Sequence, residues 1–303
     1  MSKINYSAIL SAILIVLCGG CVSTSRNTPV RVFVVSGQSN AVGYNNIRGY
    51  HGGREPFPES FRVQPQILCW ADVNDTIAAT KNAWTTLHVG DAGAFGPEIS
   101  FAHDLQAALP HSAIAIVKYA VGGTGIARSV DYTNYIPGFE HFDDHNRNWH
   151  PPSDGRDGGI LYTELLANIR NATAALDRQG IKWQFAGFVW MQGEHEASIS
   201  RTMAEDYENL LAGFIQSVRR DLHSPSLPFV IGGVNDHTWK YKDIARKCQA
   251  EVCRKDRHAV LVPTLDLPRN VRAGDGAHFD ADGMLTLGSR FAEAMRQQVP
   301  DLR

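Results

Sequence analysis

Cysteine is scarce in this chain, and its spacing excludes some kinds of site. The 303 residues contain five cysteines, of which Cys18 and Cys21 lie near the N-terminus. The other three, Cys69, Cys248 and Cys253, have no C-x-x-C spacing and therefore form no zinc signature. Cys248 and Cys253 are five residues apart. Side chains at that spacing do not face each other on one α-helix, so a disulfide between them would require a break in the helix.

The chain also lacks an excess of either charge. Its 29 Lys and Arg residues against 31 Asp and Glu residues give a formal net charge of −2. This balance gives no indication of nucleic-acid binding, and no long run of like charges predicts a solvated tail. With 44% hydrophobic and 20% charged residues, the composition is that of a globular protein with a sizeable core.

A short apolar run, residues 8–17, lies at the N-terminus behind the positive charge of Lys3. It is too short for a comfortable membrane span and has the form of a secretory signal. The small residues before Cys21 resemble the lipobox of bacterial lipoproteins. We therefore expect residues 1–28 to be a lipoprotein-type signal peptide and tether, with Cys21 as the lipidated residue.

This prediction places the protein at the periplasm, the outer membrane or the cell surface. Contact with a membrane would then be made only through the lipid anchor. The alternative is a soluble secreted protein whose signal is cleaved nearby.

Apolar runs typical of strands alternate with helical patterns through residues 29–303. Strands are expected at 30–35, 114–119, 185–191, 228–233 and 259–266. Helices are expected at 97–109, 160–179, 203–222, 241–254 and 282–299. Near-continuous apolar strands separated by helices predict a mainly parallel sheet covered on both faces. The sequence therefore predicts one α/β domain, with no internal repeat.

Two long stretches, 44–96 and 125–159, carry no clear pattern and are expected to be functional loops or to hold short elements. Within the second, residues 140–159 are rich in His, Asp, Asn and Trp. We interpret this segment as an aromatic and polar loop at the mouth of a binding cleft. A metal site and a solvated loop without a role are the alternatives, and we expect no metal.

Polar or glycine-rich residues follow four of the predicted strands directly: Ser39, Gly123, Gln192 and Asn235. Ligands of open α/β sheets bind beyond the carboxyl ends of the strands, so these residues are expected to converge at one edge.

Ser39 has the setting that a nucleophilic serine needs. Gly37 permits a tight turn after the strand, and the start of a helix near Asn40 would direct backbone N–H groups toward a reacting oxygen. The same residues are also typical of a simple helix cap. The G-x-S-x-G elbow of α/β-hydrolases is absent because position 41 is Ala.

Other pieces of a possible site lie further along the chain. Asp275 precedes His278 by three residues, so its carboxylate can fold back onto the imidazole and hold the tautomer of a general base. After the third strand, Gln192 could donate to an oxyanion, and Glu194 could orient the base or bind a sugar hydroxyl. Gly123 offers an accessible backbone N–H, and no Walker A lysine follows it.

Together these motifs resemble the SGNH-hydrolase superfamily, and within it carbohydrate esterase family 6 and the sialate O-acetylesterase-like group. The resemblance spans residues 32–287. It rests on Gly-Gln-Ser-Asn at 37–40, Gly-Pro-Glu at 96–98, Lys118 followed by Gly-Gly-Thr at 122–124, Trp-x-Gln-Gly-Glu at 190–194 and Asp-x-x-His at 275–278.

The resemblance implies a three-layer α/β/α sandwich with a flavodoxin-like sheet, and catalysis without metal or cofactor. It implies Ser39 as nucleophile and His278 as base, with Asp275 as its acidic partner and Glu194 as the alternative. The oxyanion hole would consist of the N–H groups of Ser39 and Gly123 and the side chain of Gln192. Asn40 and Glu194 are expected to bind substrate.

Two positions depart from the family pattern. Ala41 replaces a frequent Met, and Glu196 stands where Asp is usual, so the resemblance assigns no specific role to position 196.

The predicted activity is removal of O-acetyl groups from a carbohydrate through a Ser-His-Asp triad and an acyl-enzyme. The expected partner is an acetylated oligo- or polysaccharide, such as acetylxylan or a related plant polysaccharide, or an acetylated sugar. The alternatives are esterases acting on a sialate 9-O-acetyl group, on a peptidoglycan acetyl group or on a lipid, and a non-catalytic carbohydrate-binding lipoprotein.

Overall fold

The computed structural model describes most of the chain between residues 28 and 299. The described residues are 28–43, 45–46, 57–72, 80, 82–90, 94–128, 131–132, 146–153, 155–271 and 274–299. Cys21 and the rest of the predicted signal lie outside them, as does the charged part of the insertion up to residue 145. In the described part, no helix is long and apolar enough to cross a membrane.

A seven-stranded sheet forms the centre of the molecule, in the order β4-β3-β6-β1-β7-β8-β9. All neighbouring strands run parallel except β4, which is antiparallel to β3. The strands are β1 (Val30–Gly37), β3 (Val63–Asp72), β4 (Thr85–His88), β6 (Ile114–Ala120), β7 (Trp183–Met191), β8 (Phe229–Gly232) and β9 (Ala259–Val262). A small separate ribbon pairs β2 (Asn45–Asn46) with β5 (Ala94–Phe95).

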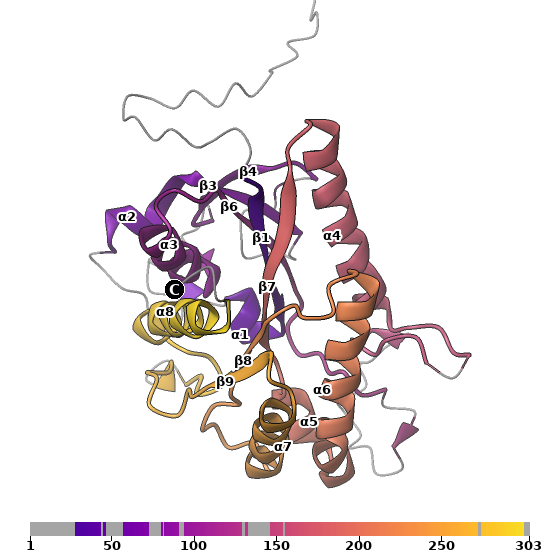
Figure 1. Ribbon diagram of the computed structural model, residues 1–303. Coiled ribbons are helices and arrows are strands. Elements are labelled where there is room, and N and C mark those ends of the chain that lie inside the picture. Colours follow the sequence, from indigo (N-terminus) through magenta and orange to yellow (C-terminus); the bar gives the residue numbers. More distant parts are fainter. Residues whose placement is uncertain are drawn as a thin grey trace, which may run out of the picture.

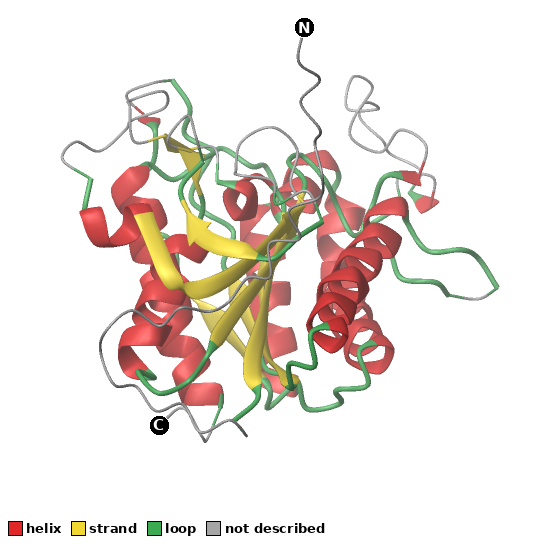
Figure 2. Cartoon of the chain, turned by 90° about the horizontal axis from the view of Figure 1, so that it is seen from above, coloured by secondary structure: helices red, strands yellow, loops and turns green. Residues whose placement is uncertain are grey.

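Helices cover both faces of this sheet (Figures 1 and 2). One face carries α4 (Ile160–Arg178), α6 (Arg201–Asp221) and α7 (Lys242–Lys255), which share a hydrophobic cluster with the strands. The other carries α3 (Glu98–Ala108), α8 (Ala281–Gln298) and the short α1 (Ser39–Val42), with a second cluster. The remaining helices are the short α2 (Glu59–Arg62) and α5 (Glu194–Ile199). The predicted three-layer α/β/α architecture is confirmed.

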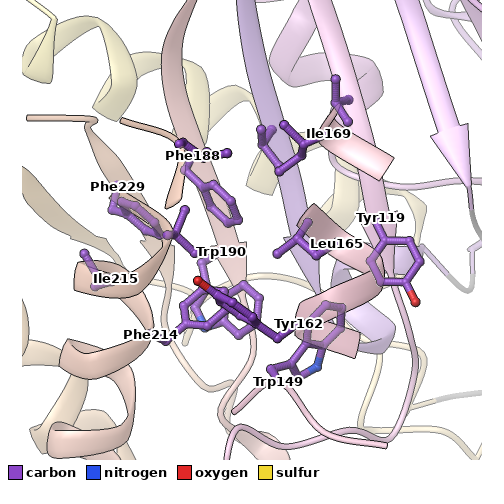
Figure 3. Close-up of a cluster of buried hydrophobic side chains, with 14 of the residues drawn as sticks. Tyr119, Trp149, Tyr162, Leu165, Ile169, Phe188, Trp190, Phe214, Ile215 and Phe229 are labelled. Atoms are coloured by element: carbon purple, nitrogen blue, oxygen red, sulfur yellow. The ribbon is translucent and has the colours of Figure 1, made fainter. Parts of the chain in front are cut away.

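Successive side chains of β7 enter the two hydrophobic clusters in turn, as the two-residue period of a strand requires. Phe188 and Trp190 lie on the α4 and α6 face, where the ring centroid of Trp190 is 4.3 Å from that of Phe214. Trp149, from the long insertion, packs edge-on against Trp190 at 5.5 Å (Figure 3). The described end of the insertion is therefore part of the core.

The structure differs from the sequence prediction mainly between residues 44 and 96. Besides short elements, which were expected as one alternative, this region holds the long strand β3, which pairs with β6 inside the sheet. The last predicted strand, 259–266, is shorter and ends at Val262 because Pro263 follows. Cys248 and Cys253 lie in α7 without a break in the helix, and Cys69, Cys248 and Cys253 are free thiols.

Candidate active site

Ser39 is the first residue of α1, directly beyond the carboxyl end of β1. The turn that carries it requires a glycine. Gly37 has φ of +137°, and a Cβ there would lie 2.1 Å from the carbonyl oxygen of Met191 on β7. The Ser39 residue is 8% exposed. A close approach of the β1 and β7 backbones thus fixes the candidate nucleophile at the sheet edge.

His278 and Asp275 are hydrogen-bonded to each other on the loop before α8. The imidazole Nδ1 lies 2.6 Å from Asp275 Oδ2, while Asp275 Oδ1 accepts the backbone N–H groups of Ala277 and His278. Partial burial acts to raise the pKa of Asp275, but the hydrogen bond and charge of His278 and these N–H groups hold it below its ordinary value. A carboxylate at Nδ1 favours the tautomer whose Nε2 can accept a proton.

Three side chains hold this loop against the rest of the site. The carbonyl of Ala277 accepts hydrogen bonds from Asn40 Nδ2 at 3.1 Å and from Asn235 Nδ2 at 2.6 Å. Arg269 Nη1 donates to the carbonyl of Gly276 at 2.8 Å. The loop that carries His278 is therefore attached both to the Ser39 helix and to the end of β8.

Asn40 is buried and bonded to protein groups on every side. Its Nδ2 donates to Ala277 and to Glu194 Oε1, and its Oδ1 accepts the N–H of Phe279 at 3.2 Å. Sequence reasoning assigned Asn40 to substrate binding. The structure gives it no exposed polar group for a substrate, and it supports the loop of His278 instead.

Glu194 is 1% exposed and lies at the start of α5, behind Asn40. Its Oε1 accepts from Asn40 Nδ2 at 3.1 Å, and its Oε2 has no hydrogen-bond partner among the described residues. Burial raises the pKa of this carboxyl to about 7. Asp275, not Glu194, is the carboxylate bonded to Nδ1 of His278, and Glu194 is too deeply buried for the predicted contact with a sugar hydroxyl.

Gln192 follows β7 and is completely buried. Its Nε2 donates to Glu196 Oε2 at 2.6 Å and to the carbonyl of Thr124 at 3.2 Å, while its Oε1 accepts from the hydroxyl of Tyr207 at 2.9 Å. Both amide hydrogens are thus directed at protein acceptors. The predicted donation to an oxyanion would require one of these bonds to break.

Glu196, for which sequence reasoning found no role, organises the segment that follows Gly123. Its Oε1 accepts the backbone N–H groups of Ile126 at 2.6 Å and Ala127 at 3.1 Å, in addition to the bond from Gln192 to its Oε2. Gly123 itself has φ of +71°, a left-handed conformation that favours glycine. No signal in the sequence indicates this contact, because Glu196 and Ile126 are 70 positions apart and Gln192 lies before the helix that carries Glu196.

Trp149 supports the same turn from the insertion. Its Nε1 donates to Thr124 Oγ1 at 2.8 Å, its backbone N–H donates to Gly125, and Thr124 Oγ1 donates to Val121 at 2.6 Å. The turn that presents the Gly123 N–H is therefore held at several points.

One protein-family model matches residues 29–297, and its description is carbohydrate esterase, sialic acid-specific acetylesterase. This chain belongs to that family. The resemblance found in the sequence is confirmed, and the chain is a carboxylic ester hydrolase of the carbohydrate acetylesterase class, with acetylated carbohydrate as its general substrate.

The relatives of this carbohydrate esterase agree in architecture. A probable carbohydrate esterase of Arabidopsis thaliana is 24% identical over 278 residues, which is 88% of this chain and 90% of that protein. The solved structure of the same Arabidopsis protein has a TM-score of 0.66 at 22% identity, with 89% of this chain and 99% of that chain covered. A carbohydrate acetylesterase from Xanthomonas citri has a TM-score of 0.60 at 18% identity, covering 89% of this chain and 56% of that one. At such identities these structures show the shared fold.

A buried ion pair lies beneath α1 of the esterase. Lys118 on β6 is bonded to Glu98 at the start of α3, and its Nζ also donates to the carbonyl of Val42 at 2.9 Å. Burial lowers the pKa of Lys118, and the charge of Glu98 opposes that shift. The Gly-Pro-Glu and Lys118 motifs thus position the end of the helix that carries Ser39.

Among the described residues, the esterase has no group of three or more His, Cys, Asp and Glu side chains arranged to hold a metal ion. Residues 140–145 of the histidine- and aspartate-rich segment lie outside the described part. In the described end of this segment, His150 Nδ1 lies 3.0 Å from Arg128 Nη2.

Proposed function

We propose that this esterase removes O-acetyl groups from carbohydrates through Ser39, His278 and Asp275 and an acyl-enzyme. The observation that carries the proposal is the 2.6 Å hydrogen bond between His278 and Asp275, on a loop that Asn40 joins to the helix of Ser39. Because Asn40 directly follows Ser39, the same short helix presents the nucleophile and holds the loop of the base.

In the first half of the reaction, Ser39 Oγ attacks the acetyl carbonyl carbon while His278 Nε2 takes the hydroxyl proton. The bond between the acyl carbon and the sugar oxygen then breaks, and His278 returns the proton to the leaving hydroxyl. In the second half, His278 takes a proton from water, which attacks the acetyl-enzyme. Acetate leaves and Ser39 regains its proton. Asp275 holds the imidazole and stabilises its charged form throughout.

We assign the oxyanion to the backbone N–H groups of Ser39 and Gly123. The buried bonds from Gln192 to Glu196 and Thr124 support a role for Gln192 in holding the Gly123 turn rather than in direct donation. Removing one donor from an oxyanion hole costs on the order of 10²–10³ in turnover.

The first experiment compares hydrolysis of p-nitrophenyl acetate by the wild type and by Ser39→Ala. The variant is expected to lose turnover by about 10⁴-fold or more. It is also expected to lose covalent labelling by a fluorophosphonate, and Ser36→Ala, at a buried serine near the end of β1, serves as the matched control. Labelling that persists in Ser39→Ala would overturn the assignment.

For the substrate, we propose an acetylated plant polysaccharide such as acetylxylan, or an acetylated sugar. The proposal is supported by the carbohydrate acetylesterase family and by the relatives named above. The test is to measure acetate release from acetylated xylan and from a 9-O-acetylated sialic acid side by side at equal enzyme concentration. Faster release from one of them decides between plant polysaccharide and sialic acid as the substrate class. Acetylated peptidoglycan and a lipid ester complete the comparison.

We further propose that the protein is exported and anchored through Cys21. The proposal is supported by the apolar run and the small residues that precede this cysteine. Expression of the full chain and of Cys21→Ser in a bacterium, followed by detergent phase partitioning, tests it. Wild type should enter the detergent phase and the variant should not. Equal partitioning into the aqueous phase would favour a soluble secreted protein.

A further inference from the structure

One side chain, that of Asn40, bonds the backbone on both sides of His278. Asn40 donates to the carbonyl of Ala277, the residue before the base, and accepts from the N–H of Phe279, the residue after it. Two opposite contacts across one residue restrict both translation and rotation of its backbone. The position of the imidazole relative to Ser39 therefore depends on Asn40.

Glu194 favours the same orientation of the Asn40 amide that the Ala277 carbonyl and the Phe279 N–H require. An amide has a donating end and an accepting end, and only the Nδ2 end can face a carboxylate. With Nδ2 bonded to Glu194 Oε1, the Oδ1 end is left for Phe279, as observed. If Glu194 were neutral and donated its proton to a reversed amide, Phe279 N–H would face a donor and lose its acceptor.

We propose that Glu194 is a positioning residue for the catalytic base, acting through Asn40 on the backbone either side of His278. The inference rests on the proposed role of Ser39 and His278. It gives Glu194 a function separate from those of an acidic partner or a sugar-binding group.

The environment of Glu194 supports this inference, because it is a poor one for a purely structural residue. The side chain is buried, Oε2 lacks a partner among the described residues, and burial disfavours its charged form by raising its pKa to about 7. The titratable groups that act on it are Glu196 on the same helix and Tyr207 on α6, while hydrogen bonds from Asn40 and from its own backbone N–H oppose the rise in its pKa. A glutamine of the same shape would carry no buried charge.

The decisive experiment is a double-mutant cycle of Glu194→Gln and Asn40→Ala, with kcat, KM and the rate of fluorophosphonate labelling as readouts. Glu194→Gln is expected to lower kcat and the labelling rate by roughly tenfold, and Asn40→Ala by about 10²-fold, because small displacements of a reacting group have effects of this size. KM should stay within about twofold. The double variant should be no slower than Asn40→Ala, because Glu194 acts only through Asn40.

The melting temperature distinguishes a positioning role of Glu194 from a purely structural one. Glu194→Gln is expected to melt at the same or a higher temperature than wild type at pH 8, while being slower. Glu205→Gln, which removes an exposed carboxylate of α6, is the matched control and should retain full activity. If Glu194→Gln does not fold, Asn40→Asp, which sets a carboxylate against Glu194 and the Ala277 carbonyl, tests the same contact and should lose at least as much activity as Asn40→Ala.

Independent, multiplying losses in the double variant would overturn the inference, as would full activity of Glu194→Gln. Both outcomes are distinct from failure of the proposed function, in which Ser39→Ala would keep its labelling and turnover whatever Glu194 does.

Discussion

The two sides of the site rest on two glutamates of one short helix, and these glutamates differ in how well they are satisfied. Glu196 supports the Gly123 side and accepts three hydrogen bonds, from Gln192 and from two backbone N–H groups. Glu194 supports the His278 side, accepts a side-chain bond from Asn40 and leaves Oε2 without a partner among the described residues. The Gly123 side is therefore built for rigidity, while the His278 side contains a carboxyl whose ionisation is disfavoured by burial.

The largest effect on kcat is expected from loss of the hydrogen bond between Asp275 and His278. Asp275→Asn replaces the acceptor at Nδ1 of His278 with an amide, so the tautomer with a free Nε2 is no longer favoured. A drop in kcat of about 10⁴-fold is expected, with little change in melting temperature. Steady-state kinetics on p-nitrophenyl acetate measure it. A loss below tenfold would mean that another group orients His278, and Asp266→Asn, at an exposed pair with Arg290, is the control.

Removing the side chain of Glu196, which supports the Gly123 turn, should lower stability as well as kcat. Glu196→Ala leaves the N–H groups of Ile126 and Ala127 and the amide of Gln192 without their acceptor, at about 1–3 kcal/mol for each unsatisfied buried group. We expect the free energy of unfolding to fall by roughly 3 kcal/mol or more, and kcat to fall with it. Urea denaturation measures the first effect. A variant as stable as wild type would show that the turn does not depend on Glu196.

The buried charge of Glu194 should appear in the pH dependence of stability. Its pKa rises from 4.5 to about 7 on folding, so between these values the folded state keeps a proton that the unfolded chain has lost. The associated stability is present below pH 4.5 and is lost as pH rises through 7, by roughly 3 kcal/mol at about 1.4 kcal/mol per pKa unit.

Glu194→Gln lacks this titration, so its stability relative to wild type should increase between pH 5 and pH 8. Urea denaturation of both proteins at the two pH values measures the difference. Parallel curves would show that Glu194 ionises as freely in the folded protein as in the unfolded chain.

A smaller effect is expected from the second amide on the loop of the base. Asn235→Ala removes one of two donors to the Ala277 carbonyl, while Asn40 continues to hold it. We expect a loss of about 1 kcal/mol in stability and a fall in kcat of less than tenfold. A loss as large as that of Asn40→Ala would show that Asn235 contributes as much as Asn40 to the position of His278.

The smallest effect on melting temperature is expected from adding a reducing agent. Because Cys69, Cys248 and Cys253 are free thiols, a reducing agent should leave the melting temperature of the protein unchanged. A decrease on reduction would indicate a disulfide.

Much of the fold could be predicted because its strands are buried on both faces and therefore read as apolar runs. β3 was not predicted because Gln64, Pro65 and Gln66 interrupt its apolar pattern. Its place in the sheet also depends on pairing with β6, about fifty residues away. Short elements such as α5 were missed for a similar reason, since tertiary contacts rather than periodicity stabilise them.

The site shows the same division between local and distant signals. The hydrogen bond between Asp275 and His278 could be predicted because three residues separate them. The contact of Asn40 with Glu194 spans 154 positions, and that of Glu196 with Ile126 spans 70. Nothing local distinguishes an amide that faces a substrate from one that is buried against a loop, so the roles of Asn40, Gln192 and Glu194 required the structure.

The burial of Trp149 has a consequence for engineering this esterase. The residue ends the stretch that follows residue 132, and its ring and N–H groups tie that point of the chain to Trp190, Thr124 and Gly125. Chimeras that exchange the sequence between Tyr132 and Asn146 with that of a relative can keep Trp149 as a fixed junction. Such exchanges would leave the support of the turn that carries Gly123 in place.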